Sequence, residues 1–248
     1  MAESLLQIRD LSVSTEERAI LHDINLSIAP GEVHVLMGPN GAGKSTLGGA
    51  IMGNPAYTVD SGSILFDGQD ITEEKADARA RAGLFLSFQN PLEVPGITLF
   101  SFIRSAAEQR GGQRVRIFQF RKKLKALMEL LDMDESYLDR DLNVGFSGGE
   151  KKKAEILQLL ALEPRLAILD ETDSGLDVDA VRTVSAGVSR FMEEGGRSLL
   201  IITHSTRILT SLPVDRTHVL VAGRLVDEGD GSLVEEINRT GFERYTGA

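Results

Sequence analysis

The sequence contains neither cysteine nor tryptophan, and it has no long apolar run. Without cysteine, disulfides, thiolate catalysis and cysteine-ligated metal sites are excluded. The longest uninterrupted apolar runs are four residues, for example 199–202, whereas a membrane-spanning helix needs about 20 predominantly apolar residues. Because residues 1–4 lack the features of a secretion signal, we expect a cytoplasmic protein that does not insert into a membrane.

Basic residues are outnumbered by acidic ones. The chain of 248 residues has 27 Lys and Arg against 37 Asp and Glu, which gives a formal net charge of −10. Nonspecific affinity for nucleic acid comes from clustered Lys and Arg, so this balance argues against nucleic acid as the main partner. The hydrophobic fraction of 42% is still enough for a substantial core. We expect one domain over residues 1–248.

Short apolar strands alternate with helical stretches, a pattern typical of α/β layering. The expected strands are 5–13, 24–28, 33–37, 63–66, 84–88, 166–169, 198–203 and 218–222. A type II turn is expected at 29–32, where proline and glycine take the central positions, and a hairpin turn at 67–68. The β character disappears between residue 91 and about residue 162, which predicts a helical insertion between two core segments, 1–90 and 163–248.

The sharpest motif follows the apolar strand at 33–37 and precedes a helical stretch. It fits the phosphate-loop pattern G-x-x-x-x-G-K-[ST] in the strand–loop–helix setting that the pattern requires. Glycines let backbone N–H groups face phosphate oxygens, the helix N-terminus adds the positive end of its dipole, and the lysine adds a mobile charge. The expected nucleotide-binding residues are Gly38, Pro39, Asn40, Gly41, Ala42, Gly43, Lys44, Ser45 and Thr46, with the Ser45 hydroxyl on Mg²⁺.

A phosphate loop needs an acid that positions the metal ion and a group that activates the attacking water. The apolar stretch 166–169 ends in Asp170 and Glu171, at the sheet edge where α/β proteins place their ligands. We expect Asp170 to hold Mg²⁺ through its water shell and Glu171 to polarise the attacking water. Taken alone, an acid pair after a strand is as typical of a helix N-cap as of a catalytic site. The phosphate loop elsewhere in the chain is what favours the functional interpretation.

A third motif, Phe146-Ser147-Gly148-Gly149-Glu150, resembles the LSGGQ signature of ATP-binding-cassette (ABC) ATPases, with Phe for Leu and Glu for Gln. The resemblance implies a P-loop NTPase fold of the ABC ATPase type, with a RecA-like core, an N-terminal antiparallel β subdomain and the signature at the end of an inserted helical subdomain, 91–162. It also implies that Ser147, Gly148, Gly149 and Glu150 complete the nucleotide site of a second copy in an ATP-dependent dimer. From the residues alone, an ordinary N-cap turn remains the alternative.

Three further positions match this family in the right order. Gln89 resembles the Q-loop glutamine that reaches the metal and the attacking water, Asp177 resembles the D-loop aspartate at the dimer interface, and His204 resembles the switch histidine that contacts the γ-phosphate. One position departs from the family. Many ABC ATPases stack adenine on an aromatic residue upstream of the phosphate loop, where this chain offers only the apolar Val13, so base selectivity stays open.

Longer strings, at 89–96, 143–152 and 169–177, resemble the SufC branch of this family, the soluble ATPases of the SUF iron–sulfur cluster assembly machinery. This resemblance implies a Mg-dependent ATPase with ATP and Mg²⁺ as cofactors, whose dimer drives a conformational change in SufB- and SufD-type scaffold proteins. Iron–sulfur clusters are held mainly by cysteine thiolates. A chain without cysteine is therefore expected to move the scaffold rather than to carry the cluster.

Two alternatives stay open: the nucleotide-binding subunit of an ABC transporter, and a regulatory module that binds ATP without hydrolysing it. The stretch 104–125 has eight basic residues and one acid, but apolar residues interleave with the charges. It therefore indicates a solvated or partner-facing helical surface rather than a nucleic-acid site. We expect the scaffold to dock on residues 97–145, with 89–96 as the link to the nucleotide.

Overall fold

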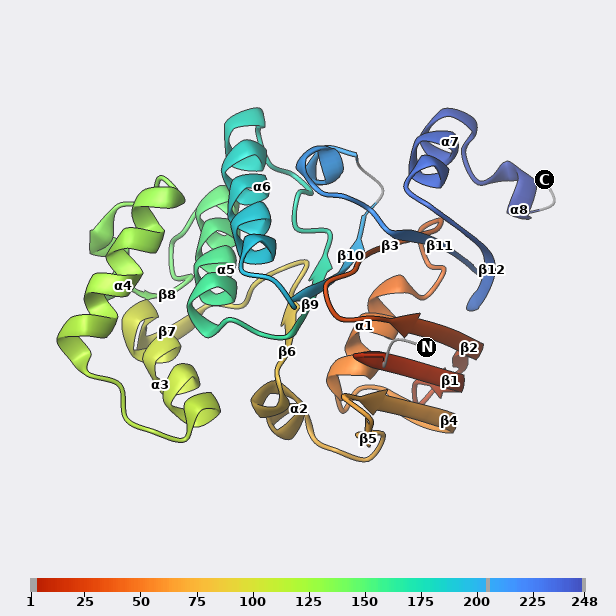
Figure 1. The fold of residues 1–248 in the computed structure, drawn as a ribbon, viewed down its shortest axis with the longest axis horizontal. Helices are drawn as coiled ribbons and strands as arrows, with labels where there is room; N and C mark the ends of the chain where they lie inside the picture. Colours follow the sequence, from red (N-terminus) through yellow and green to blue (C-terminus); the bar gives the residue numbers. More distant parts are fainter. Residues whose placement is uncertain (1–3, 204–205, 247–248) are drawn as a thin grey trace.

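The computed structural model describes residues 4–203 and 206–246. Its central sheet has the strand order β12-β11-β3-β10-β9-β6 (Figure 1). The strands are β3 (Val33–Met37), β6 (Leu84–Ser87), β9 (Leu166–Asp170), β10 (Ser198–Ile202), β11 (Arg216–Val221) and β12 (Arg224–Gly229). Neighbouring strands pair in parallel except β11 and β12, which form an antiparallel hairpin.

Strands β3, β10 and β9 are buried along their whole length. Successive side chains of a strand point to opposite faces, so each of these strands supplies two cores. In β9, Ala167 and Leu169 join the core that contains α5 (Gly148–Leu162) and α6 (Val178–Glu193), while Leu166 and Ile168 join the core of the N-terminal sheet. Continuous apolar runs are what strands covered on both faces require.

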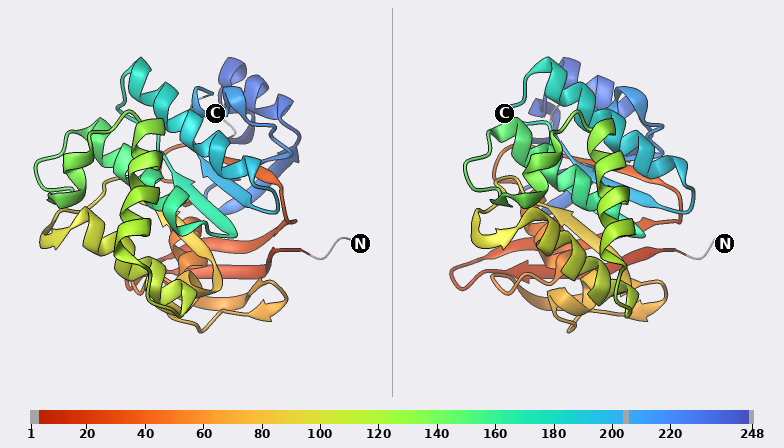
Figure 2. Two further views of the ribbon diagram at one scale, coloured as in Figure 1. Left: turned by 60° about the vertical axis from the view of Figure 1, so that its left-hand side comes forward. Right: turned by 90° about the vertical axis from the view of Figure 1, so that its left-hand side faces the viewer.

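A second, antiparallel sheet has the order β2-β1-β4-β5 and lies on the side of the central sheet opposite α5 and α6 (Figures 1 and 2). Its strands are β1 (Leu6–Ser14), β2 (Ala19–Ile28), β4 (Thr58–Phe66) and β5 (Gln69–Asp70). Asp10 and Asp23 have φ of 47° and 52° and lie where the pairing of β1 with β2 is irregular. These irregularities interrupt the alternation of side chains between the two faces of the sheet. For this reason the sequence predicted the second strand only from residue 24.

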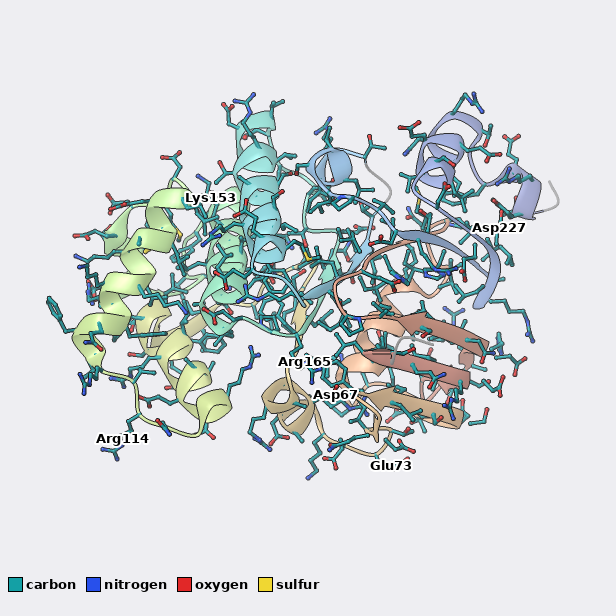
Figure 3. The ribbon with its side chains drawn as sticks, in the orientation of Figure 1. Asp67, Glu73, Arg114, Lys153, Arg165 and Asp227 are labelled. Atoms are coloured by element: carbon teal, nitrogen blue, oxygen red, sulfur yellow. The ribbon has the colours of Figure 1, made fainter. Side chains whose placement is uncertain are left out.

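Both predicted turns are confirmed. Gly31 has φ of 88°, and the N–H of Glu32 donates to the carbonyl of Ala29 at 3.3 Å, which is the type II geometry. Asp67 starts the turn between β4 and β5. Arg165, the residue before β9, donates to both carboxylate oxygens of Asp67 at 2.5 and 2.7 Å (Figure 3). This ion pair ties the N-terminal sheet to the central sheet.

The helices between residues 91 and 162 gather at one end of the molecule (Figure 1). They are α3 (Leu99–Gly111), α4 (Ile117–Leu130) and α5, with a 3₁₀ turn at Glu135–Asp139. The prediction that β structure is absent there was wrong, because β7 (Val94–Thr98) pairs with β8 (Asp141–Leu142). The N–H of Gly96 also donates to the Asp141 carboxylate at 2.8 Å. Two short segments that pair over a long sequence distance show no local alternation of apolar and polar residues, so the sequence pattern does not reveal them.

The remaining helices are α1 (Lys44–Met52), α2 (Ala76–Ala82), α7 (Ser232–Thr240) and α8 (Glu243–Thr246), with a 3₁₀ turn at Ile208–Ser211. In the basic stretch, Arg121, Lys123 and Lys125 form ion pairs with acids of the same chain, which supports a solvated surface. Within residues 4–203 and 206–246, none of the helices has the length and apolar character needed to cross a bilayer.

Two histidines are buried against each other where β3 pairs with β11. His34 Nδ1 lies 2.9 Å from His218 Nε2, and His34 Nε2 lies 2.9 Å from the carboxylate of Glu32. Burial, and then the neighbouring His34, lower the pKa of His218 to about 4, with Glu228 pulling the other way and Arg216 adding to the depression. Burial also lowers the pKa of His34, against the pull of Glu32.

We expect the free energy of unfolding to fall as the pH drops from 7 to 5. The folded chain keeps His218 neutral in this range and disfavours protonation of His34, whereas the unfolded chain binds protons below its histidine pKa of about 6.5. The part of the free energy of unfolding that comes from these histidines is therefore complete above that pH and is lost progressively below it. Urea unfolding at pH 7, 6 and 5 measures the effect. His218→Gln should flatten the dependence, and an unchanged pH slope in that variant would contradict the assignment.

Candidate nucleotide site

The phosphate loop leaves β3 and ends where α1 begins. Gly43 caps α1 with φ of 106°, a conformation that residues with a Cβ rarely adopt. A Cβ on Gly43 would lie 2.8 Å from Leu21 Cδ2, and a Cβ on Gly38 would lie 2.1 Å from the carbonyl oxygen of Leu220. The two glycines therefore let the loop pack directly against both β2 and β11.

Lys44 folds back over the loop that precedes it. Its Nζ donates to the carbonyls of Gly38 at 2.7 Å and Pro39 at 3.1 Å, and the residue is 7% exposed. Burial lowers the pKa of Lys44, and the charges of Glu171 and Asp170 oppose that shift. An ammonium group held by carbonyls at the loop is placed to meet phosphate oxygens.

One cavity of about 420 Å³ brings the phosphate loop together with two residues from other strands. Gln89, beyond β6, and Glu171, directly after β9, both line it. The loop residues in its lining are Asn40, Gly41, Gly43, Lys44, Ser45 and Thr46. Pro39 and Ala42 shape the loop, because the N–H of Ala42 donates to the carbonyl of Pro39 at 3.2 Å.

Asp170 ends β9 and is 6% exposed. Burial raises the pKa of Asp170, while a hydrogen bond from the side chain of Ser45 lowers it and Glu171 raises it further. Among the described residues, its Oδ1 has no hydrogen-bond partner. A buried carboxylate oxygen is unfavourable unless a cation or a donor reaches it.

The residues around Asp170 fit a magnesium ion that is shared with a phosphate ligand. Mg²⁺ usually binds one or two protein groups and takes its other ligands from phosphates and water. Ser45 and Asp170, in contact with each other, supply a hydroxyl and a carboxylate. Within residues 4–203 and 206–246 there is no cluster of three or more His, Asp or Glu that could hold a metal ion.

Glu171 has a strained backbone. Its φ of 46° is sparsely populated for a residue with a side chain and costs about 1–3 kcal/mol. Its N–H donates to the carbonyl of Ile202 at 2.9 Å, and its Oε2 accepts a hydrogen bond from Gln89 Nε2 at 2.6 Å. Strain of this kind persists where the surroundings impose it, which is common at functional sites.

The Ser147 to Glu150 segment opens α5 and does not line the cavity of its own chain. Ser147 Oγ accepts from the N–H of Glu150 at 3.3 Å, and Glu150 Oε2 accepts from the N–H of Ser147 at 2.7 Å. This capping box is joined by the hydroxyl of Tyr137, which donates to Glu150. A Cβ on Gly148 would meet nothing within 4 Å, so packing within this chain does not explain the glycine.

Asp177 is the N-cap of α6, where its Oδ1 accepts from the N–H of Ala180 at 2.8 Å. The next residue, Val178, is 67% exposed although it is apolar. His204 lies outside the described residues, so its predicted contact with the γ-phosphate stays a prediction.

The sequence did not reveal a buried ion pair that joins α5 to the residue before Gln89. Lys152 and Glu155 are each 4% exposed and lie 3.1 Å apart. Lys152 Nζ donates to the carbonyl of Phe88 at 2.5 Å, and the N–H of Phe88 donates to Glu155 Oε1 at 2.8 Å. Burial raises the pKa of Glu155, and Lys152 opposes the shift. Charges three residues apart on a helix usually form an exposed pair, so only tertiary structure could show this one to be buried.

We expect Lys152→Met to destabilise the fold by about 3–5 kcal/mol, because it leaves Glu155 as an uncompensated buried charge. The double variant Lys152→Met/Glu155→Leu should regain a large part of the loss. Lys151→Met is the matched control, since Lys151 pairs with Glu93 at the surface, where such a pair contributes at most about 1 kcal/mol. Denaturant unfolding of all three variants tests this. Equal stability of the two single variants would show that the pair at Lys152 is not a buried one.

Two further residues of the cavity were also missed, Arg18 and Ile20, from the turn between β1 and β2 and the start of β2. Val13, which was expected to offer apolar contact to a base, is fully buried and does not line the cavity. The sequence signal was weak, because Arg18 follows two acids in what reads as an ordinary polar turn.

Comparison with known proteins places this geometry in a family. The family model described as "ABC transporter" matches residues 21–174, more than half of the chain. A solved ATP-binding subunit of an ABC transporter superposes with a TM-score of 0.76 at 26% identity, over 96% of this chain and 93% of that one. A dimeric ATP-binding cassette in a post-hydrolysis state with ADP and Pi gives a TM-score of 0.79 at 20% identity, over 91% of this chain and 98% of that one. The chain belongs to the ABC ATPase family and has its P-loop NTPase fold.

Within that family, two curated relatives cover almost the whole chain. The probable ATP-dependent transporter SufC of Escherichia coli (strain K12) is 44% identical over 242 residues, which is 96% of this chain and 97% of that protein. A probable ABC transporter ATP-binding protein of Streptococcus pyogenes serotype M18 is 48% identical over 241 residues, 96% and 94%. The chain is therefore an ATP-binding ABC ATPase with SufC among its relatives.

Proposed function

We propose that this chain is a Mg²⁺-dependent ATPase whose ATP-driven dimer moves a SufB- and SufD-type scaffold during iron–sulfur cluster assembly. The observation that supports it most is the single cavity in which Lys44, Ser45, Gln89 and Glu171 meet. The near full-length likeness to a SufC protein supports the assembly role. The lack of cysteine suits a motor better than a cluster carrier.

The phosphates of ATP rest on the loop, where backbone N–H groups and the positive end of α1 face them. Lys44 exchanges the carbonyls of Gly38 and Pro39 for the β- and γ-phosphates. Ser45 and Asp170 hold Mg²⁺, which supplies neutralising charge beside the phosphate oxygens.

Glu171 orients the attacking water and accepts its proton as the water oxygen bonds to the γ-phosphorus. The bond from that phosphorus to the β,γ-bridging oxygen breaks in the same reaction, and ADP leaves. Gln89 fixes the carboxylate of Glu171 through the 2.6 Å hydrogen bond to Oε2. His204 is assigned to the γ-phosphate on the family resemblance alone.

A second copy of the chain completes the site. The glycine-rich start of α5 offers backbone N–H groups and a helix dipole, and Gly148 faces open space in its own chain. The start of α5 therefore binds the γ-phosphate in the site of the other copy. Asp177, beside the exposed Val178, lies at the same interface.

The scaffold docks on an apolar groove between the central sheet and the helices of the insertion. Of the segment 97–145, where docking was expected, only α3 lines this groove. This groove, of about 350 Å³, is lined by residues of α1, α2, β6, α3 and α5 and by the segments that follow β6 and α5. Its aromatic residues are Phe85, Phe88 and Phe102. Phe88 is 56% exposed, and the nearby Leu92 is 79% exposed. Exposed apolar side chains around a groove mark an interaction site.

A nucleotide-binding subunit of an ABC transporter is the second candidate function. The printed name of the Streptococcus pyogenes relative favours it. In that case the same groove would receive a membrane subunit.

The first prediction for this function concerns Glu171→Gln. The amide keeps the size of the side chain but cannot accept a proton, so ATP affinity should persist while hydrolysis slows by about 10²–10⁴-fold. Closed dimers should accumulate with MgATP and be visible by size-exclusion chromatography. Lys44→Ala should instead weaken ATP binding itself. Wild-type turnover of Glu171→Gln in the presence of partner proteins would remove Glu171 from the mechanism.

The second prediction concerns the partner. Affinity purification without detergent should yield soluble proteins of the SufB and SufD type, identified by mass spectrometry. Phe88→Ser should reduce this capture by about tenfold or more, as expected for an aromatic anchor. Phe118→Ser is the matched control, because Phe118 is 83% exposed on α4, away from the groove lining, and should capture normally. Partners that require detergent would support the transporter alternative instead.

A further inference from the structure

The nucleotide cavity extends beyond the phosphate loop to a wall made by the first hairpin. Arg18 and Ile20 line this wall. Gln89 and Glu171 mark the end of the cavity where the γ-phosphate is cleaved, so the base of a nucleotide must lie toward the remaining lining. That lining, all of it within the described residues, contains no aromatic side chain.

Backbone hydrogen bonds fix the hairpin against the phosphate loop. The N–H and the hydroxyl of Thr15 both donate to the carbonyl of Arg18, at 2.9 and 3.3 Å. Four residues further on, the N–H of His22 donates to the carbonyl of Gly223 at 2.9 Å, and the N–H of Gly223 donates to the carbonyl of Ala42 at 3.0 Å. The backbone that carries Arg18 is therefore held against the phosphate loop through Gly223.

Arg18 carries a group with the right shape for the face of a purine. A guanidinium is planar, weakly hydrated and stacks on aromatic rings. Ile20 beside it adds apolar contact and is partly buried. To the other described residues, the side chain of Arg18 makes no hydrogen bond or ion pair, so stacking on a base would not require it to give up such a partner.

We propose that Arg18 serves as the base platform of this site, stacking its guanidinium on the purine in place of an aromatic side chain, which the described lining of this cavity lacks. The proposal rests on the nucleotide-binding role proposed above for the phosphate loop. Because stacking reads the face of a base and not its hydrogen-bonding edge, adenine and guanine nucleotides should bind with similar affinity.

Calorimetric titration of the full chain with Mg²⁺ and either ADP or pyrophosphate tests this role, because the two ligands share phosphates and only ADP has a base. Arg18→Ala should weaken ADP binding about tenfold and leave pyrophosphate binding within about twofold. Arg18→Tyr, which supplies a planar ring, should restore most of the ADP affinity. Arg18→Lys, which keeps the positive charge but has no planar group to stack on the base, should not. Glu17→Ala, in the same exposed turn, is the control and should bind both ligands as the wild type does.

An equal loss of ADP and pyrophosphate affinity in Arg18→Ala would overturn the proposal, because it would mean that the charge acts on phosphate. Unchanged ADP affinity in that variant would overturn it as well. Failure of the wild-type chain to bind either ligand would instead refute the nucleotide-binding role of the loop, so the two failures are distinguishable.

Discussion

The site depends on one constraint, the parallel pairing of β6, β9, β10 and β3. Parallel strands need long crossover connections, and their carboxyl ends all reach the same edge of the sheet. That edge receives Gly38 after β3, Asp170 at the end of β9 and Gln89 beyond β6. Gln89 and Glu171 are 82 positions apart in the sequence and still form a hydrogen bond.

The N-terminal sheet takes part in the site as well as covering the core. Gly43 and Gly38 have no room for a side chain, because Leu21 of β2 and the backbone of β11 lie directly against them. The phosphate loop is therefore held between a strand of each sheet. This contact explains why residues so far upstream as Arg18 can reach the nucleotide cavity.

The sequence predicted those features that local patterns encode. The phosphate loop, the acid pair and the two tight turns each require particular residues at fixed spacing, because each depends on a particular backbone geometry. The features that escaped prediction depend on distant contacts. The pairing of Val94 with Leu142 has no local signature, and the burial of Lys152 and Glu155 follows only from how α5 packs. For Ser147 the structure shows a capping box, and its role toward a second chain remains a proposal.

In the proposed assembly, Phe88 is the point where docking and chemistry meet. Its side chain lines the docking groove, while its own N–H and carbonyl are held by Glu155 and Lys152 of α5. The next residue, Gln89, holds the strained Glu171. A scaffold that displaces the backbone of Phe88 must therefore either break its two hydrogen bonds to the Lys152–Glu155 pair or move α5 with it. Because α5 begins at the signature segment, the second route connects docking to closure of the dimer. Thermodynamic linkage then requires the reverse effect: closure on ATP must favour the scaffold conformation that docks best.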